Sequence, residues 1–270
     1  MTRTVENLPS RIESWSDLSN LIEHFSYFSA HDWLFRGVTD ADQTLVAKIG
    51  REKTRAQKRD PKSGKFKRVS YRLADERGVF TMFKAQALSH IQRVPTTQLE
   101  WLALAQHFGI PTRLLDWTEN ILVATWFAVE KAGAKDNGAD AAIWITKGVP
   151  ALDSDNTGDP FEIKAPGVYR PAHISPRISA QASVLMLCPT PTKEVKLNFT
   201  HKVTIARGIE FTIKKRLNAC GVNRRLLFPD LAGLAEHLAW LHKNDYLAGY
   251  RHDARSKVRP TPDEEDQLII

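Results

Sequence analysis

The densest group of side chains able to do chemistry lies in residues 106–118, between two apolar segments. Arg113 and Asp116 stand three residues apart, and Thr118 follows just before a strongly apolar run. One interpretation is structural: Asp116 or Thr118 caps the next helix, and Arg113 pairs with Asp116 to hold a turn. The other is a ligand site in which these groups face a cavity. A third is hydrolysis with His107 as general base beside Asp116, although no Ser or Cys nucleophile stands nearby.

A second candidate is Arg36, which follows the apolar residues 33–35 and precedes Gly37. A buried, unpaired guanidinium is costly, so Arg36 needs a carboxylate, phosphate or carbonyl partner. One possible partner is Asp116. In the alternative interpretation the planar guanidinium binds the phosphates of a ligand, and Gly37 allows that ligand to approach the backbone closely.

A third candidate is the pair Arg177 and Gln181, which precedes an apolar strand predicted over residues 183–188. Gln181 places an uncharged hydrogen-bonding group where many enzymes have a carboxylate. The two residues either anchor a loop or face the same ligand site as Arg36.

Several classes of protein are disfavoured by composition. The histidines are scattered without ligand spacing, so we predict no metal site. The only cysteines, Cys188 and Cys220, form no disulfide framework, which favours a reducing cytoplasmic location. No apolar run reaches the roughly 18 residues needed to span a bilayer, and residues 1–11 have no apolar core typical of a secretion signal. We therefore expect no membrane partner.

The positive charge is concentrated in residues 51–68. The whole chain carries a net charge of +7, and this segment alone has nine basic and two acidic residues, so it accounts for the entire surplus. Such a segment is typical of contact with nucleic-acid phosphates or of a solvated loop. The predicted nucleic-acid contacts are Arg51, Lys53, Arg55, Lys58, Arg59, Lys62, Lys65, Lys67 and Arg68.

The elements that must position these residues follow from hydrophobic periodicity and capping signals. The patterns predict helices over residues 14–28, 71–91, 99–108, 118–131 and 230–241, and strands over residues 33–38, 141–146, 183–188, 202–206 and 209–213. Residues 51–68 and 150–176 are predicted to be loops, the first of them mobile. We expect an α+β fold with small mixed or antiparallel sheets flanked by helices. One main domain would cover residues 1–250, and a flexible tail residues 251–270.

Four motifs together resemble the FRG domain family, which is named for Phe-Arg-Gly. They are Phe35–Gly37, Trp101–Thr118 with its continuation to Glu130, Arg177–Gln181 and Leu227–Leu231. The resemblance covers about residues 33–240, and the second motif is highly specific. One departure is Ala182–Val184, where the family more often has a glycine and then a phenylalanine.

The order of these motifs is similar to that of ADP-ribosyltransferases of the Arg–Ser–Glu type. This resemblance implies an ADP-ribosyltransferase-like fold and an NAD-dependent transferase, such as a toxin or an antiphage defence effector. It implies catalytic roles for Arg36, Asp116, Thr118 and Gln181. It implies contacts to NAD from Arg36, Gly37, His107, Arg113, Trp117 and Arg177. NAD would be the substrate, with no metal required.

Gln181 falls near the position of the catalytic glutamate of those enzymes, but it has no formal charge and would stabilise a cation less well. Either Asp116 supplies the negative charge, or the chain binds a nucleotide without transferring it. The acceptor would be a nucleic acid or a protein. The alternative function is a non-catalytic nucleotide- or nucleic-acid-binding module that uses residues 51–68.

Overall fold

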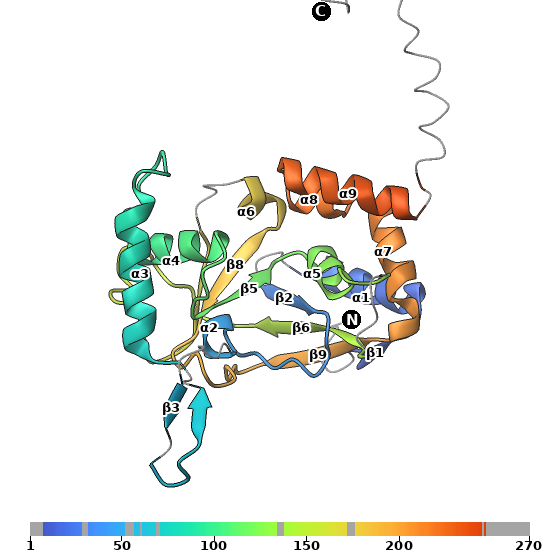
Figure 1. Cartoon of the computed structure of the whole chain (residues 1–270). Helices are drawn as coiled ribbons and strands as arrows, with labels where there is room; N and C mark the ends of the chain where they lie inside the picture. The colour runs from blue at the N-terminus through green and yellow to red at the C-terminus, as the bar shows by residue number, and fades with distance from the viewer. Residues whose placement is uncertain are drawn as a thin grey trace, which may run out of the picture. The chain divides into compact units, whose positions relative to one another are not determined.

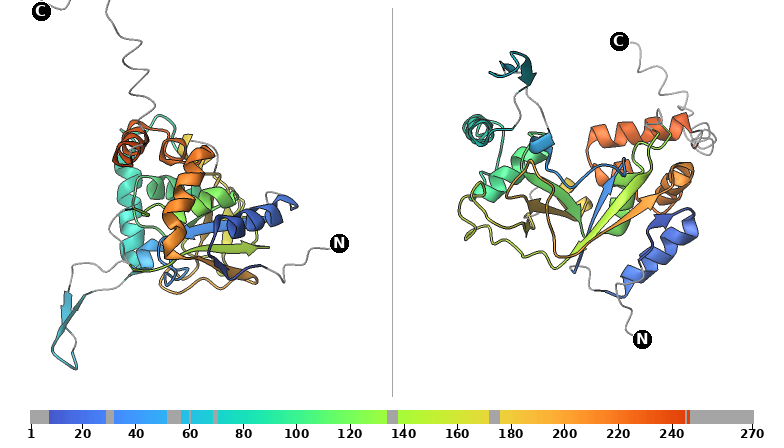
Figure 2. Two further views of the ribbon diagram at one scale, coloured as in Figure 1. Left: turned by 90° about the vertical axis from the view of Figure 1, so that its right-hand side faces the viewer. Right: turned by 90° about the horizontal axis from the view of Figure 1, so that it is seen from below.

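The computed structural model describes residues 8–28, 32–51, 57–59, 61–68, 71–133, 138–171, 176–244 and 246 (Figures 1 and 2). It has the predicted α+β architecture, built on a mixed seven-stranded sheet with the strand order β1-β9-β6-β2-β5-β8-β7. Only β1 and β9 are parallel, and the other neighbours are antiparallel. The strands are β1 (Arg11–Ile12), β2 (Trp33–Val38), β5 (Leu114–Thr118), β6 (Ala141–Lys147), β7 (Gly167–Tyr169), β8 (Ser183–Leu187) and β9 (Thr200–Ile205).

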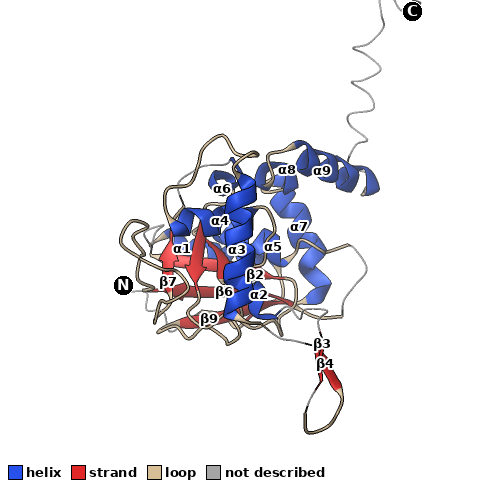
Figure 3. Cartoon of the chain, turned by 60° about the vertical axis from the view of Figure 1, so that its left-hand side comes forward, coloured by secondary structure: helices blue, strands red, loops and turns tan. Residues whose placement is uncertain are grey.

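Helical segments alternate with these strands along the chain (Figure 3). They are α1 (Trp15–Ser26), α2 (Lys48–Arg51), α3 (Leu73–Ala87), α4 (Gln98–His107), α5 (Ile121–Ala128), α6 (Pro176–Ala180), the 3-10 turn η2 (Arg207–Ile209) and α7 (Glu210–Ala219), followed by α8 (Arg224–Leu227) and α9 (Leu231–Lys243). The predicted helix at 14–28 begins with a capping box between Ser14 and Asp17.

Strands β5 and β8 send alternate side chains into two apolar clusters, as the period of a strand requires. Leu114, Leu185 and Leu187 pack with residues of α3 and α4. The other cluster contains Leu34, Leu45, Leu115, Trp117, Val184 and Met186. The sheet therefore has a core on each face, and β5 contributes to both.

Strand β2 pairs fully with β6 but only briefly with β5. Six residues of β2 pair with β6, whereas the pairing with β5 is limited to Phe35 and Thr118. Beyond that pair the two strands separate, so Arg36 and Asp116 stand on opposite sides of an opening in the sheet.

Gly37 lies against α5, which explains why this position lacks a side chain. A Cβ there would come within 1.9 Å of the main-chain oxygen of Ala124 and 2.5 Å of the main-chain nitrogen of Ala128. Close helix packing therefore accounts for Gly37 without a ligand. The interpretation that the glycine makes room for a ligand stays a prediction, since Gly37 also lines the cavity described below.

The chain divides into two compact units, Met1–Val222 and Asn223–Ile270, where the sequence had suggested one main domain over residues 1–250. In the described part of the second unit, Asn223 caps α8 and Asp230 caps α9. Residues 251–270, predicted to be a flexible tail, lie outside the described residues.

Several local predictions are wrong. Residues 209–213 belong to η2 and α7, because Ile213 and Leu217 are buried at helical spacing. The predicted loop at 51–68 contains an antiparallel hairpin of β3 (Gln57–Arg59) and β4 (Phe66–Arg68), with Gly64 at a φ of 64° between them. Residues 150–176 include β7. The cap of α5 is neither Asp116 nor Thr118 but Asn120, whose side chain accepts from the N–H of Leu122.

Candidate functional site

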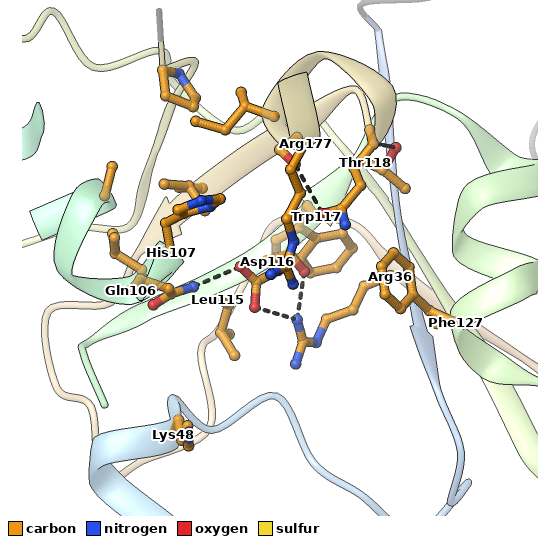
Figure 4. Close-up of a pocket in the computed structure, with 18 of the residues that line it drawn as sticks. Arg36, Lys48, Gln106, His107, Leu115, Asp116, Trp117, Thr118, Phe127 and Arg177 are labelled. Atoms are coloured by element: carbon orange, nitrogen blue, oxygen red, sulfur yellow. Dashed lines mark hydrogen bonds and ion pairs between the residues drawn. The ribbon is translucent and has the colours of Figure 1, made fainter. Parts of the chain in front are cut away.

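A cavity of about 330 Å³ opens where β2 and β5 separate (Figure 4). Its wall is formed by residues of β2, α2, α4, β5, α5, α6 and β8. The volume lies at the lower end of the range typical of small-molecule sites, roughly 300–1,000 Å³. Elements distant in the chain thus meet around one hollow.

Almost all the residues predicted for catalysis or NAD binding line this cavity. They are Arg36, Gly37, His107, Asp116, Trp117, Thr118, Arg177 and Gln181. Arg113 is the exception. Residues of three of the four motifs thus line one cavity, and their chemical roles stay predictions.

Arg36 bridges the opening between the two strands. Its Nη1 donates to the main-chain oxygen of Asp116 at 2.5 Å and lies 3.9 Å from Oδ2 of the same residue. The Arg36 side chain is only 13% exposed, and that of Asp116 is 69% exposed. Burial lowers the pKa of Arg36, while the charges of Asp116 and Arg51 act on it in opposite directions. A buried guanidinium thus lies beside an exposed carboxylate in the cavity wall.

The carboxylate of Asp116 is also held from the side of α4. Nε2 of Gln106 donates to Oδ1 of Asp116 at 2.6 Å, and Figure 4 shows this amide directed at the carboxylate. The hydroxyl of Thr112 in turn donates to Oε1 of Gln106. The carboxylate therefore has one oxygen bound to α4 and the other on the side of Arg36.

Thr118 connects β5 to the segment that carries Gln181. Its hydroxyl donates to the main-chain oxygen of Gln181 at 2.7 Å and accepts from the N–H of Asn120 at 3.1 Å. Ala182, which follows Gln181, has a φ of 44°, in the left-handed region that favours glycine. This conformation gives a physical reason for the glycine that the family more often has near this position.

Arg113 is a buried structural residue and does not pair with Asp116. Its Nη2 lies 2.7 Å from Oε2 of Glu76, and both side chains are only 2% exposed. Its guanidinium also donates to the hydroxyl of Tyr71 and packs over the ring of Phe161. Burial opposes the charged form, but the hydrogen bond and charge of Glu76 raise the pKa of Arg113. The partner comes from α3, which local spacing around Asp116 does not reveal.

Among the charged and amide side chains of the wall, the sequence does not predict three for this cavity: Lys48, Arg51 and Gln106. Gln106 stands at the start of the 106–118 motif, so its place in that motif was the available signal. Arg51 had been assigned only to the basic segment. Lys48, whose Nζ donates to the main-chain oxygen of Gly109, had no distinguishing pattern around it.

The cavity wall has a surplus of positive charge. Arg36, Lys48, Arg51 and Arg177 line it, and Asp116 is the one carboxylate-bearing residue among the described residues that do so. Guanidinium and ammonium groups bind phosphates, so this wall is suited to an anionic, phosphate-bearing ligand. The indole Nε1 of Trp117 is buried, without a hydrogen-bond partner in the described part of the chain.

Within the described residues, no three His, Cys, Asp or Glu side chains gather in a way that would hold a metal ion. None of the helices in the same residues combines the length and apolarity needed to cross a membrane.

The side chains of the basic segment are only partly described. Lys62 and Lys65 are exposed, and Arg51 lines the cavity. Lys53 and Arg55 lie outside the described residues, as do the side chains of Lys58, Arg59, Lys67 and Arg68.

Comparison with known families gives a match for the part of the chain that forms most of this cavity. Residues 31–137 match the model of the FRG domain family, a range that runs from just before β2 to beyond α5. The chain therefore carries an FRG domain, and most of the cavity wall falls within it. Arg177 and Gln181 lie beyond the matched range. Neither a curated protein nor a solved structure matches the chain significantly.

Proposed function

We propose that this chain is an ADP-ribosyltransferase-like enzyme and that the cavity between β2 and β5 binds NAD. The observation that carries the proposal is the buried guanidinium of Arg36 beside Asp116 in a wall rich in cations. The diphosphate of NAD would lie against Arg36, Lys48 and Arg51. The nicotinamide ribose would lie next to Asp116.

The reaction makes a specific electrostatic demand on this site. The bond from ribose C1′ to nicotinamide breaks, nicotinamide leaves with the bonding electron pair, and the ribose becomes an oxocarbenium-like cation. An acceptor O–H or N–H group then bonds to C1′ and gives its proton to Asp116. Because Gln181 has no charge, Asp116 is the group that stabilises the cation. This assignment agrees with its position as the one carboxylate in the described wall.

Release of nicotinamide from NAD tests the proposal, with binding of ADP-ribose measured separately. We expect Arg36→Ala to weaken ADP-ribose binding and Asp116→Asn to lower turnover with smaller effects on binding. Arg72→Ala is a matched control, because Arg72 pairs with Asp75 on α3 and lies outside the cavity wall. Absence of both nicotinamide release and ADP-ribose binding in the wild-type protein refutes the proposal.

A non-catalytic module that binds nucleic acid is the second candidate, and the position of Arg51 favours it. Arg51 both begins the basic segment and lines the cavity, so a bound polyanion would extend from the segment to the cavity. Binding of single-stranded DNA and RNA should then weaken steeply as salt is raised, since phosphate contacts release counterions. Affinity that does not change with salt refutes this candidate.

A further inference from the structure

A chain of hydrogen bonds runs behind the carboxylate of Asp116 and starts at a main-chain N–H. The N–H of Leu114 donates to Oγ1 of Thr112 at 3.1 Å. The Thr112 hydroxyl donates to Oε1 of Gln106, and Nε2 of Gln106 donates to Oδ1 of Asp116 at 2.6 Å. Three side chains from α4, β5 and the turn between them are thereby connected in series.

The direction of this chain is set at its far end, because the ionised carboxylate of Asp116 can only accept. The Gln106 amide therefore presents its NH₂ group to Asp116 and its Oε1 to Thr112. The Thr112 hydroxyl must then donate its one hydrogen to that oxygen, and it accepts from the N–H of Leu114 with a lone pair. Thr112 is 2% exposed, so water does not compete for its hydroxyl.

We propose that Gln106 and Thr112 are positioning residues that orient Asp116 for the reaction proposed above. Gln106 donates to Oδ1, Thr112 holds the Gln106 amide, and Oδ2 stays on the side of Arg36 for the bound ribose. This inference rests on the proposed function for its catalytic consequence. The hydrogen-bond chain itself is a property of the protein without ligand.

Four variants separate positioning from general structural support. Gln106→Leu removes the amide, and Thr112→Val removes the hydroxyl at nearly constant shape. Thr112→Ser keeps the hydroxyl and should restore function. Gln86→Leu is the matched control, because Gln86 is exposed on α3 and does not line the cavity. Gln106→Leu leaves the N–H of Leu114 paired with Thr112, so it remains informative if Thr112→Val does not fold.

The kinetic readout is the separation of kcat from KM for nicotinamide release. We expect kcat to fall roughly 10²-fold in Gln106→Leu and Thr112→Val, as a misplaced reacting group does, with KM changed less than about threefold. Thr112→Ser and Gln86→Leu should stay close to wild type. Equal losses in Thr112→Ser and Thr112→Val, or unchanged kcat in Gln106→Leu, would overturn the inference.

A spectroscopic readout on the protein without ligand distinguishes failure of the positioning inference from failure of the proposed function. The ¹H–¹⁵N resonances of the Gln106 side-chain amide should shift in Asp116→Asn and in Thr112→Val but not in Thr112→Ser. If these shifts occur while NAD is not turned over, the proposed function fails and the positioning of Asp116 stands. Resonances that do not move in Asp116→Asn and Thr112→Val overturn the positioning itself.

Discussion

Replacing Gly37 by alanine tests whether packing or ligand access determines this residue of the Phe-Arg-Gly motif. The added Cβ would stand 1.9 Å from the main-chain oxygen of Ala124, and main-chain atoms of a buried helix cannot move aside as a flexible side chain does. Overpacking of this kind costs about 1–3 kcal/mol, and a clash with backbone favours the upper end. At about 2–4 °C per kcal/mol for a unit of this size, the melting temperature should fall by roughly 6–12 °C.

Thermal unfolding followed by circular dichroism measures this effect, and Gly78→Ala is the control. Gly78 is exposed on α3, and a Cβ there meets no atom within 4 Å. Alanine in this helix should therefore raise the free energy of unfolding by about 0.5–1 kcal/mol. If Gly37→Ala melts like the wild-type protein but no longer binds ADP-ribose, the packing explanation is wrong and Gly37 serves the ligand.

Three further predictions concern other parts of the chain. Ala182→Gly should raise the free energy of unfolding by up to about 1 kcal/mol, because it relieves a left-handed φ of 44°; a loss of stability in urea melts would contradict this. In the folded protein a thiol reagent at pH 8 should modify Cys220 and leave Cys188 intact, since burial raises the pKa of Cys188 to about 12; denaturant should expose both, and rapid reaction of Cys188 in the native protein would refute the reasoning. Burial, with a smaller contribution from Arg225, lowers the pKa of His237 below its usual 6.5. Folding therefore disfavours protonation of His237. The free energy of unfolding should be highest above pH 6.5 and should fall as the pH drops below that value. His237→Gln should weaken this decline in melts recorded at different pH values. An unchanged dependence of stability on pH would contradict the role given to His237.

Long-range contacts override local sequence patterns at two places in this protein. Arg113 and Asp116 are three residues apart, yet Arg113 pairs with Glu76, which lies 37 positions away. The predicted strand at 209–213 is helical because burial of Ile213 and Leu217 overrides the local preference of β-branched residues. In both cases the decisive partner is brought close only by the fold.

The sequence alone determined the features that depend on neighbours within one or two turns. These include the start of α1 near residue 14, the start of α9 at Asp230 and the end of α4 before Gly109, because caps and left-handed glycines act through adjacent backbone groups. It also singled out Arg36 and Asp116, since charged residues set in apolar segments need a partner.

The tertiary structure decided how those residues meet. The limited pairing of β2 with β5 opens the cavity, and the register of the sheet is a long-range property that no local pattern contains. The tertiary structure also brings Lys48 and Arg51 of α2 to the wall beside Arg36, and it places Gln106 behind Asp116. The charge of the cavity and the orientation of its carboxylate therefore arise from segments that are separate in the chain, because only folding sets the distances between them.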